Sequence, residues 1–313
     1  MSELSKNKKV TVVGAGNVGA TTAQLIAEKS LSDVVLIDII EGIPQGKALD
    51  MFEACPLWHS SSRVVGTNNY DDTAGSDVVV ITAGLARKPG MSRDDLLKAN
   101  AAIVKKVSEN VLATSPDTII IVVSNPMDAM AHVAQKVTGF PHNRVIGMGG
   151  VLDTSRMRSF ISLETGVPPK DIQAMVLGGH GDLMVPVYRL TTVDGKNISD
   201  VLDDAKIHAI VERTKGGGAE IVSHLKTGSA YYAPAASTVE MIENILGLKD
   251  ETLPCSVYLN GEYGISGVYV GVPVKLGSHG LEKIIELDLS EEDVKALHAS
   301  ADSVRELMDK LEI

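Results

Sequence analysis

The sequence predicts an α/β protein with a doubly wound parallel sheet in its N-terminal half and an α+β domain in its C-terminal half. Short runs rich in Val and Ile alternate with helical patterns as far as about residue 146, which is typical of a parallel sheet covered by helices. The second half has longer helical patterns and strands of mixed spacing. At 313 residues the chain is too long for one typical core, which favours two domains.

Five apolar runs are the expected strands of the first half. They cover residues 10–13, 34–37, 78–81 and 119–123, with 144–146 as a weaker candidate. Their residues are apolar in succession rather than in alternation, which indicates strands buried on both faces. Helical periodicity lies between them, over 20–27, 46–52, 96–112 and 129–137. Strand and helix therefore alternate as in a doubly wound fold.

The second half is expected to begin with a helix over 152–163, because Gly166 and Pro168 follow it. The remaining expected elements are strands at about 174–177 and 185–192, helices over 199–225 and 235–246, a strand pair at about 256–259 and 268–275, and a last helix that Ser290 opens. We expect the boundary near 147–150, which divides the chain into a dinucleotide-binding domain, 1–148, and a substrate domain, 149–313.

Composition and charge exclude several function classes. A formal net charge of −11 argues against binding to nucleic acid or to anionic membranes, both of which select basic surfaces. No apolar run approaches the length of a membrane span, and the first nine residues lack the apolar core of a signal peptide. Cys55 and Cys255 show no zinc-site spacing, so no metal is expected. Two buried thiols in a reducing compartment are favoured over a disulfide, and we expect a cytoplasmic protein.

A glycine-rich turn follows the first expected strand and opens a helix, with the sequence Gly14-Ala15-Gly16-Asn17-Val18-Gly19. Gly14 allows a tight turn, Gly16 lets the backbone approach a pyrophosphate, and Gly19 lets the helix pack on the strand. Asp38 ends the next strand, where a carboxylate accepts hydrogen bonds from a ribose diol and repels a 2′-phosphate. The pattern predicts a Rossmann domain that binds NAD rather than NADP through the residues of this turn and Asp38.

The sequence resembles the lactate/malate dehydrogenase family over nearly its whole length. The resemblance is carried by the glycine-rich turn and Asp38, and by four further blocks in the family's order: residues 83–93 (AGLARKPGMSR), 124–126 (SNP), 152–156 (LDTSR) and 178–182 (GGHGD). In detail the chain looks like the malate-specific members that share the lactate dehydrogenase type of fold. The resemblance implies cofactor contacts by Asn100, Val123 and Asn125, and a homotetramer rather than a homodimer.

His180 is the expected general acid and base for oxidation of an alcohol. An imidazole exchanges protons near neutral pH, and Gly-Gly-His-Gly-Asp is too rich in glycine for the interior of a helix or strand. We interpret the other seven histidines as surface or core residues. Asp153 is the expected carboxylate partner of His180, with Asp182 as the second candidate. Arg156, three residues after Asp153 on the same helical face, is expected to hold the substrate carboxylate by two parallel hydrogen bonds.

Three further side chains complete the expected substrate site. Asn125 lies past the strand over 119–123, where its amide can donate to the substrate oxygen. The segment 85–95 is interpreted as a lid that brings Arg87 and Arg93 over the substrate. Arg93 would stabilise the charge that develops on the carbonyl oxygen. Lactate dehydrogenases usually carry Gln at the position of Arg87, so arginine there implies a substrate with a second carboxylate, as in malate.

Three alternatives are compared with this interpretation. A lactate dehydrogenase or another 2-hydroxy acid dehydrogenase would share every residue named except Arg87. A non-catalytic NAD-binding regulator would account for the glycine-rich turn and Asp38, but it gives no reason for His180, Asp153 and Arg156 to occur together. A sugar hydrolase on a Rossmann fold would be expected to need metal ligands, and the sequence offers no clear set.

Overall fold

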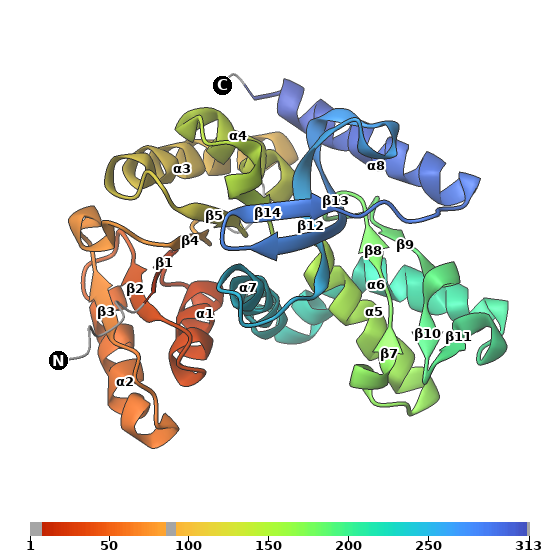
Figure 1. Cartoon of the computed structure of the whole chain (residues 1–313), viewed down its shortest axis with the longest axis horizontal. Coiled ribbons are helices and arrows are strands. Elements are labelled where there is room, and N and C mark those ends of the chain that lie inside the picture. Colours follow the sequence, from red (N-terminus) through yellow and green to blue (C-terminus); the bar gives the residue numbers. More distant parts are fainter. Residues whose placement is uncertain (1–7, 86–91, 312–313) are drawn as a thin grey trace.

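A computed structural model of the chain describes residues 8–85 and 92–311 and confirms the α/β architecture (Figure 1). One sheet of nine strands runs through the molecule in the order β14-β13-β12-β6-β5-β4-β1-β2-β3. Six of these strands are parallel: β1 Lys9–Val13, β2 Asp33–Ile37, β3 Val64–Thr67, β4 Val78–Ile81, β5 Ile119–Val122 and β6 Val145–Gly147. Because β1 lies between β2 and β4, the strand order reverses at β1, where such sheets bind ligands.

Helices cover both faces of this sheet. They are α1 Asn17–Glu28, α2 Ile43–Trp58, α3 Arg93–Thr114, α4 Met127–Thr138, α5 Gly150–Thr165, α7 Tyr232–Ile245 and α8 Glu291–Asp309. A further helix, α6 Asp204–Leu225, packs against α5. Ser290 accepts a hydrogen bond from the Asp293 amide and so caps α8 as expected. The helix expected over 46–52 is longer in the structure because α2 continues through Pro56.

The expected strand pair of the second half does not form a separate sheet. Strands β12 Thr252–Asn260, β13 Ser266–Gly277 and β14 Gly280–Ile284 extend the central sheet, and β12 joins β6 antiparallel through Ser256 and Gly147. The expected strands near 174–177 and 185–192 are broken into short pieces: β7 Ile172–Gln173, β8 Val176–Leu177, β9 Val185–Pro186 and β10 Thr192–Val193, with β11 Lys196–Asn197 beside them.

Two strands of the nine-stranded sheet, β3 and β14, are missing from the sequence-based prediction. The β3 sequence Val64-Val65-Gly66-Thr67 is short and is interrupted by a glycine. The close approach of α2 requires that glycine, because a Cβ at Gly66 would lie 2.6 Å from the Cα of Gln45. Strand β14 has only two apolar side chains, Leu281 and Ile284, with the charged Glu282 and Lys283 between them, so its apolar signal is weak.

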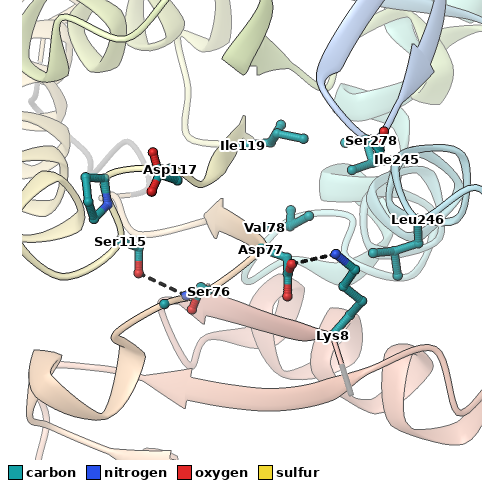
Figure 2. A pocket seen from close by; sticks show the side chains of 12 residues that line it. Lys8, Ser76, Asp77, Val78, Ser115, Asp117, Ile119, Ile245, Leu246 and Ser278 are labelled. Carbon is teal, nitrogen blue, oxygen red and sulfur yellow. Dashed lines mark hydrogen bonds and ion pairs between the residues drawn. The ribbon is translucent and has the colours of Figure 1, made fainter. Parts of the chain in front are cut away.

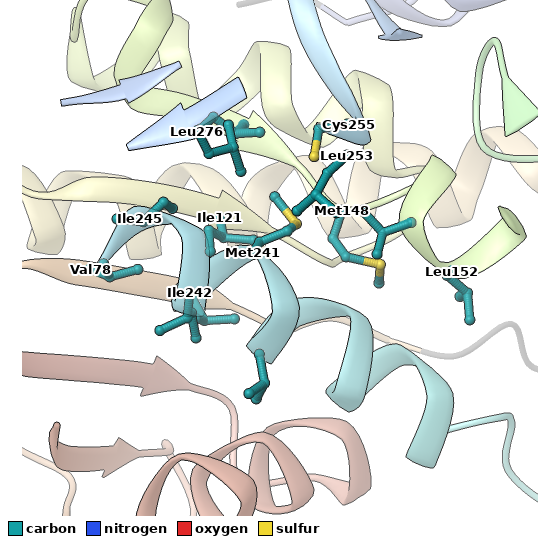
Figure 3. Packing of buried hydrophobic residues seen from close by; sticks show 14 of the residues in the cluster. Val78, Ile121, Met148, Leu152, Met241, Ile242, Ile245, Leu253, Cys255 and Leu276 are labelled. Atoms are coloured by element: carbon teal, nitrogen blue, oxygen red, sulfur yellow. The ribbon is translucent and has the colours of Figure 1, made fainter. Parts of the chain in front are cut away.

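The hydrophobic core lies between the sheet and the helices on each face. Figure 3 shows Met241, Ile242 and Ile245 of α7 beside side chains of the sheet strands, including Val78 of β4. Burying an aliphatic side chain of this size contributes about 1.5–3 kcal/mol. Cys55 and Cys255 are free thiols in the same core. This packing fixes the loops at the carboxyl ends of the strands.

Candidate active site

The glycine-rich turn has the geometry that a dinucleotide phosphate requires. Gly14 adopts φ +105°, and a Cβ there would lie 2.9 Å from the Ala83 amide nitrogen. At Gly19 a Cβ would collide with the Gly14 carbonyl, whereas space is open at Gly16. The first turn of α1 has no acidic residue and no side-chain cap, so its amides are available to an anion.

Asp38 lies at the end of β2 and contacts this turn. One carboxylate oxygen accepts a hydrogen bond from the Ala15 amide at 2.6 Å, and the other accepts one from the Ile40 amide at 3.0 Å. Lys47 of α2 donates to the Ala15 carbonyl at 2.7 Å. The sequence analysis did not single out Lys47. Its partner lies 32 residues away, and only the packing of α2 beside the turn brings the two together.

His180 and Asp153 form a hydrogen-bonded pair. Nδ1 of His180 lies 2.8 Å from Oδ2 of Asp153, whose side chain is 2% exposed. A carboxylate can only accept, so Nδ1 carries the proton and the neutral ring keeps Nε2 free as an acceptor. Asp182, the second candidate for this role, instead lies 3.7 Å from Arg93 on the surface.

The charge around His180 favours its protonated form. Burial by itself lowers the pKa of His180, but the carboxylates of Asp153 and Asp128 outweigh burial, so the pKa lies above the usual value. The guanidinium of Arg156 opposes this shift without reversing it. The imidazole is therefore well suited to hold a proton and to release it to a reacting oxygen.

Arg156 shares the carboxylate of Asp153 with His180. Its Nη1 donates to Oδ1 of Asp153 at 3.1 Å, as the three-residue spacing on α5 predicts. The side chain is 12% exposed, and its Nε is buried without a hydrogen-bond partner. Gly217 of α6 makes room for it, because a Cβ there would lie 3.1 Å from Cδ of Arg156. A largely buried guanidinium with an unused donor beside His180 has the chemistry to bind a carboxylate.

The expected lid is described only in part. Arg87 lies outside the described residues. Arg93 is the first residue of α3, and its ion pair with Asp182 places it beside the loop that carries His180. Both partners of that pair are mostly exposed, so Arg93 is free to turn toward a substrate.

Asn125 and Val123 follow β5 at the carboxyl edge of the sheet. The Val123 amide donates to the Ile81 carbonyl, and the Asn125 side chain is exposed. Asn100 is buried. Its Oδ1 accepts a hydrogen bond from the Leu85 amide at 2.7 Å, and its Nδ2 donates to the Asn125 carbonyl at 2.7 Å. Asn100 thus joins the start of the expected lid to the loop after β5, and a cofactor contact by Asn100 stays a prediction.

Asp128 is a buried carboxylate beside His180 that the sequence analysis missed. It accepts a hydrogen bond from the His180 main-chain amide at 2.8 Å. The pKa of Asp128 is raised, because the effect of burial exceeds the lowering by its hydrogen bonds from Ser256 and from the His180 amide. Its position two residues after Pro126 at the start of α4 is the only sequence signal, and an N-terminal Asp is common in helices.

A cavity of about 340 Å³ lies away from these residues, at the amino ends of β1, β4 and β5 (Figure 2). It is lined by the Lys8–Asp77 ion pair, by serines and by the end of α7. Ligands of doubly wound folds bind at the opposite, carboxyl edge, where the Asp153–His180 pair and the glycine-rich turn lie. Among residues 8–85 and 92–311, no group of three or more His, Cys, Asp or Glu has the arrangement of a metal site.

Comparison with known proteins identifies the family. Family models described as "lactate/malate dehydrogenase, NAD binding domain" and "lactate/malate dehydrogenase, alpha/beta C-terminal domain" match residues 8–147 and 150–312. The chain belongs to the lactate/malate dehydrogenase family. It is an NAD-dependent oxidoreductase whose NAD-binding domain contains the glycine-rich turn and Asp38.

Malate dehydrogenases are among its relatives. The chain is 57% identical over 304 residues to the malate dehydrogenase of Chloroherpeton thalassium, and the match covers 97% of this chain and 98% of the relative. It is 58% identical over 299 residues to that of Chlorobium luteolum, covering 95% and 96%. The solved malate dehydrogenase of Salinibacter ruber is 51% identical with a TM-score of 0.93, covering 97% of each chain.

A solved lactate dehydrogenase is also similar. The enzyme of Cryptosporidium parvum, in complex with lactic acid and nicotinamide adenine dinucleotide, is 43% identical with a TM-score of 0.93, and the match covers 97% of each chain. Overall fold therefore does not separate the two substrates within this family. In the described part of the chain, no helix is long and apolar enough to cross a membrane.

Proposed function

We propose that this chain is an NAD-dependent malate dehydrogenase that interconverts (S)-malate and oxaloacetate. The observation that carries the proposal is the shared carboxylate of Asp153, which contacts His180 on one oxygen and Arg156 on the other. One side of α5 thus orients a proton carrier and a carboxylate-binding guanidinium together. The malate dehydrogenases at 57% and 58% identity support the choice of substrate.

His180 moves the proton. In malate oxidation, Nε2 accepts the proton of the C2 hydroxyl as the C–H bond at C2 breaks, and the ring becomes an imidazolium paired with Asp153. In oxaloacetate reduction the imidazolium returns this proton to the carbonyl oxygen. The bound cofactor would supply the redox chemistry, because the nicotinamide ring of NAD⁺ can accept the hydride from C2 and that of NADH can return it.

The remaining residues bind and orient. Arg156 holds the C1 carboxylate by two parallel hydrogen bonds, which fixes C2 against His180. Arg93 stabilises the oxygen on C2 as negative charge develops, and Asn125 donates to the same oxygen. Arg87 pairs with the second carboxylate, which sets malate apart from lactate.

The cofactor site uses the turn after β1 and the residue after β2. Amides of the turn Gly14-Ala15-Gly16-Asn17-Val18-Gly19 and of α1 bind the pyrophosphate. Asp38 accepts hydrogen bonds from the adenosine ribose and excludes a 2′-phosphate. Asn100, Val123 and Asn125 contact the cofactor from the adjacent strands and helix.

A substrate panel tests this proposal. The ultraviolet absorbance of NADH is followed after adding oxaloacetate, pyruvate, 2-oxoglutarate or hydroxypyruvate, with NADPH as the alternative cofactor. The proposal expects oxaloacetate with NADH to have the highest kcat/KM. Preference for pyruvate would replace malate with lactate as the substrate, and preference for NADPH would contradict the role of Asp38.

We also infer a homotetramer in the cytoplasm, rather than a homodimer. Helix α2 exposes Phe52 and Leu57, and Ile39 before it is 95% exposed; large apolar side chains exposed on a monomer are compatible with burial between subunits. The free thiols Cys55 and Cys255 fit a reducing compartment. The family-model boundaries support a division into domains 1–148 and 149–313. Light scattering after size exclusion tests the tetramer, and a dimer mass would overturn it.

A further inference from the structure

The main chain that carries His180 is fixed at three successive amides. These hydrogen bonds run from Gly178 to the Gly271 carbonyl (2.8 Å), from Gly179 to the Ser300 hydroxyl (2.8 Å), and from His180 to the Asp128 carboxylate (2.8 Å). The three acceptors belong to β13, α8 and α4. The imidazole therefore stands on a glycine-rich segment that would be mobile without these anchors.

Asp128 is itself held on both oxygens. Oδ2 accepts from the His180 amide, and Oδ1 lies 2.6 Å from the hydroxyl of Ser256, a fully buried residue of β12. Asp128 is 5% exposed, so water offers little replacement for either partner. A buried carboxylate with both oxygens engaged cannot rotate without leaving a polar group unsatisfied.

The packing leaves the segment little other freedom. A Cβ at Gly179 would lie 3.0 Å from Cγ2 of Val304 and 3.4 Å from Oδ2 of Asp128. The carboxylate and the helix α8 thus close around the backbone directly before His180. A shift of His180 away from Asp128 would also move its ring relative to Asp153.

We propose that Asp128 is a positioning residue for the reaction, because its hydrogen bond to the His180 amide keeps the imidazole against Asp153 and against the reacting oxygen of the substrate. The inference rests on the proposed function, which makes His180 the proton carrier. Asp128 bonds the main-chain amide of His180, whereas the imidazole ring bonds Asp153. The charged groups that face His180 are Asp153 and Arg156 from α5 and Asp128 from α4, whereas α8 and β12 contribute neutral serines.

Two substitutions separate the hydrogen bond from the charge. Asp128→Asn removes the charge but keeps an acceptor for the His180 amide, because its amide group can donate to the Ser256 hydroxyl. Asp128→Ala removes the acceptor and leaves the His180 amide unsatisfied. If Asp128 acts through this hydrogen bond, Asp128→Asn should keep the kcat that Asp128→Ala loses.

The experiment measures kcat, KM for NADH and the pH profile of malate oxidation for both variants. Asp128→Ala is expected to lower kcat roughly 30- to 100-fold, the scale for misplacing a catalytic group by about 1 Å, with KM for NADH unchanged. Its acid limb moves to lower pH for two reasons: the Asp128 charge that raises the His180 pKa is lost, and His180 is no longer held against Asp153. Asp128→Asn loses only the charge, so its acid limb moves less. Asp128→Asn is expected to retain a kcat close to that of the wild type.

The matched control is Glu243→Ala, which removes another buried carboxylate. Glu243 lies in α7 and is paired with Lys29 and Lys249, so its loss should leave the pH profile unchanged. Equal losses in Asp128→Asn and Asp128→Ala, or full activity in Asp128→Ala, would overturn the proposal. If the Asp128→Ala protein does not fold, Ser256→Ala tests the proposal instead. It frees one oxygen of Asp128, so the carboxylate can rotate and kcat should fall. An unchanged kcat in Ser256→Ala would also overturn the proposal. A wild type without oxaloacetate activity would instead refute the proposed function.

Discussion

Asp153→Asn is the perturbation whose consequence the structure defines most closely. Asp153 accepts from two N–H donors, Nδ1 of His180 at 2.8 Å and Nη1 of Arg156 at 3.1 Å. An asparagine offers one acceptor oxygen and one NH₂ group. One donor would therefore face another donor inside a buried site.

Each way of resolving this conflict damages the reaction. If the NH₂ group faces His180, the ring must adopt the tautomer with the proton on Nε2, which cannot accept the substrate proton. If it faces Arg156, the guanidinium moves away. Losing one charge-assisted hydrogen bond costs about 1.5–3 kcal/mol. That corresponds to roughly 10- to 150-fold in kcat/KM for malate.

The assay measures kcat/KM for malate across pH, with NADH binding measured by fluorescence. Removing the Asp153 charge lowers the pKa of His180, so the acid limb of malate oxidation moves to lower pH. The matched control is Asp302→Asn. Asp302 is exposed and paired with Arg305 at the same three-residue spacing, so this substitution should change neither kcat/KM for malate nor its pH profile. A wild-type rate and pH profile in Asp153→Asn would show that Asp153 neither orients His180 nor raises its pKa.

Three further predictions address cofactor, substrate and pH. Asp38→Ser should narrow the ratio of kcat/KM for NADH over NADPH, and an unchanged ratio would remove Asp38 from the cofactor site. Arg87→Gln should lower kcat/KM for oxaloacetate, raise it for pyruvate, and change their ratio by roughly 30-fold or more, whereas Arg93→Gln should impair both substrates alike. In the wild type, oxaloacetate reduction should fail as pH rises through the His180 pKa and malate oxidation as pH falls through it. Because that pKa is raised, both limits should lie above the usual histidine value, and limits below it would contradict the pairing with Asp153.

The sequence predicted those parts of the molecule that depend on local patterns. Strands β1, β2, β4 and β5 are continuous apolar runs, so their positions follow from the sequence alone. The proximity of Asp153 and Arg156 follows from their spacing on one helix. The need of a catalytic histidine for a carboxylate partner left two candidates, Asp153 and Asp182, and the structure places Asp153 against the imidazole.

The features that could not be predicted depend on contacts between distant parts of the chain. Asp128 meets His180 across 52 residues and Ser256 across 128 residues, and nothing near Asp128 in sequence signals either partner. The addition of β12 to the edge of the parallel sheet depends on its pairing with β6. Such pairings are decided by tertiary packing, which overrides the local pattern.

The proposed reaction requires His180 to carry the proton in the NAD-dependent conversion of oxaloacetate to malate. Wild type and His180→Asn are compared in one measurement of NADH consumption with oxaloacetate, alongside NADH binding by fluorescence. The wild type is expected to consume NADH, whereas His180→Asn should bind NADH equally well but show turnover reduced about 100-fold or more. Near wild-type turnover in His180→Asn would exclude His180 as the proton carrier.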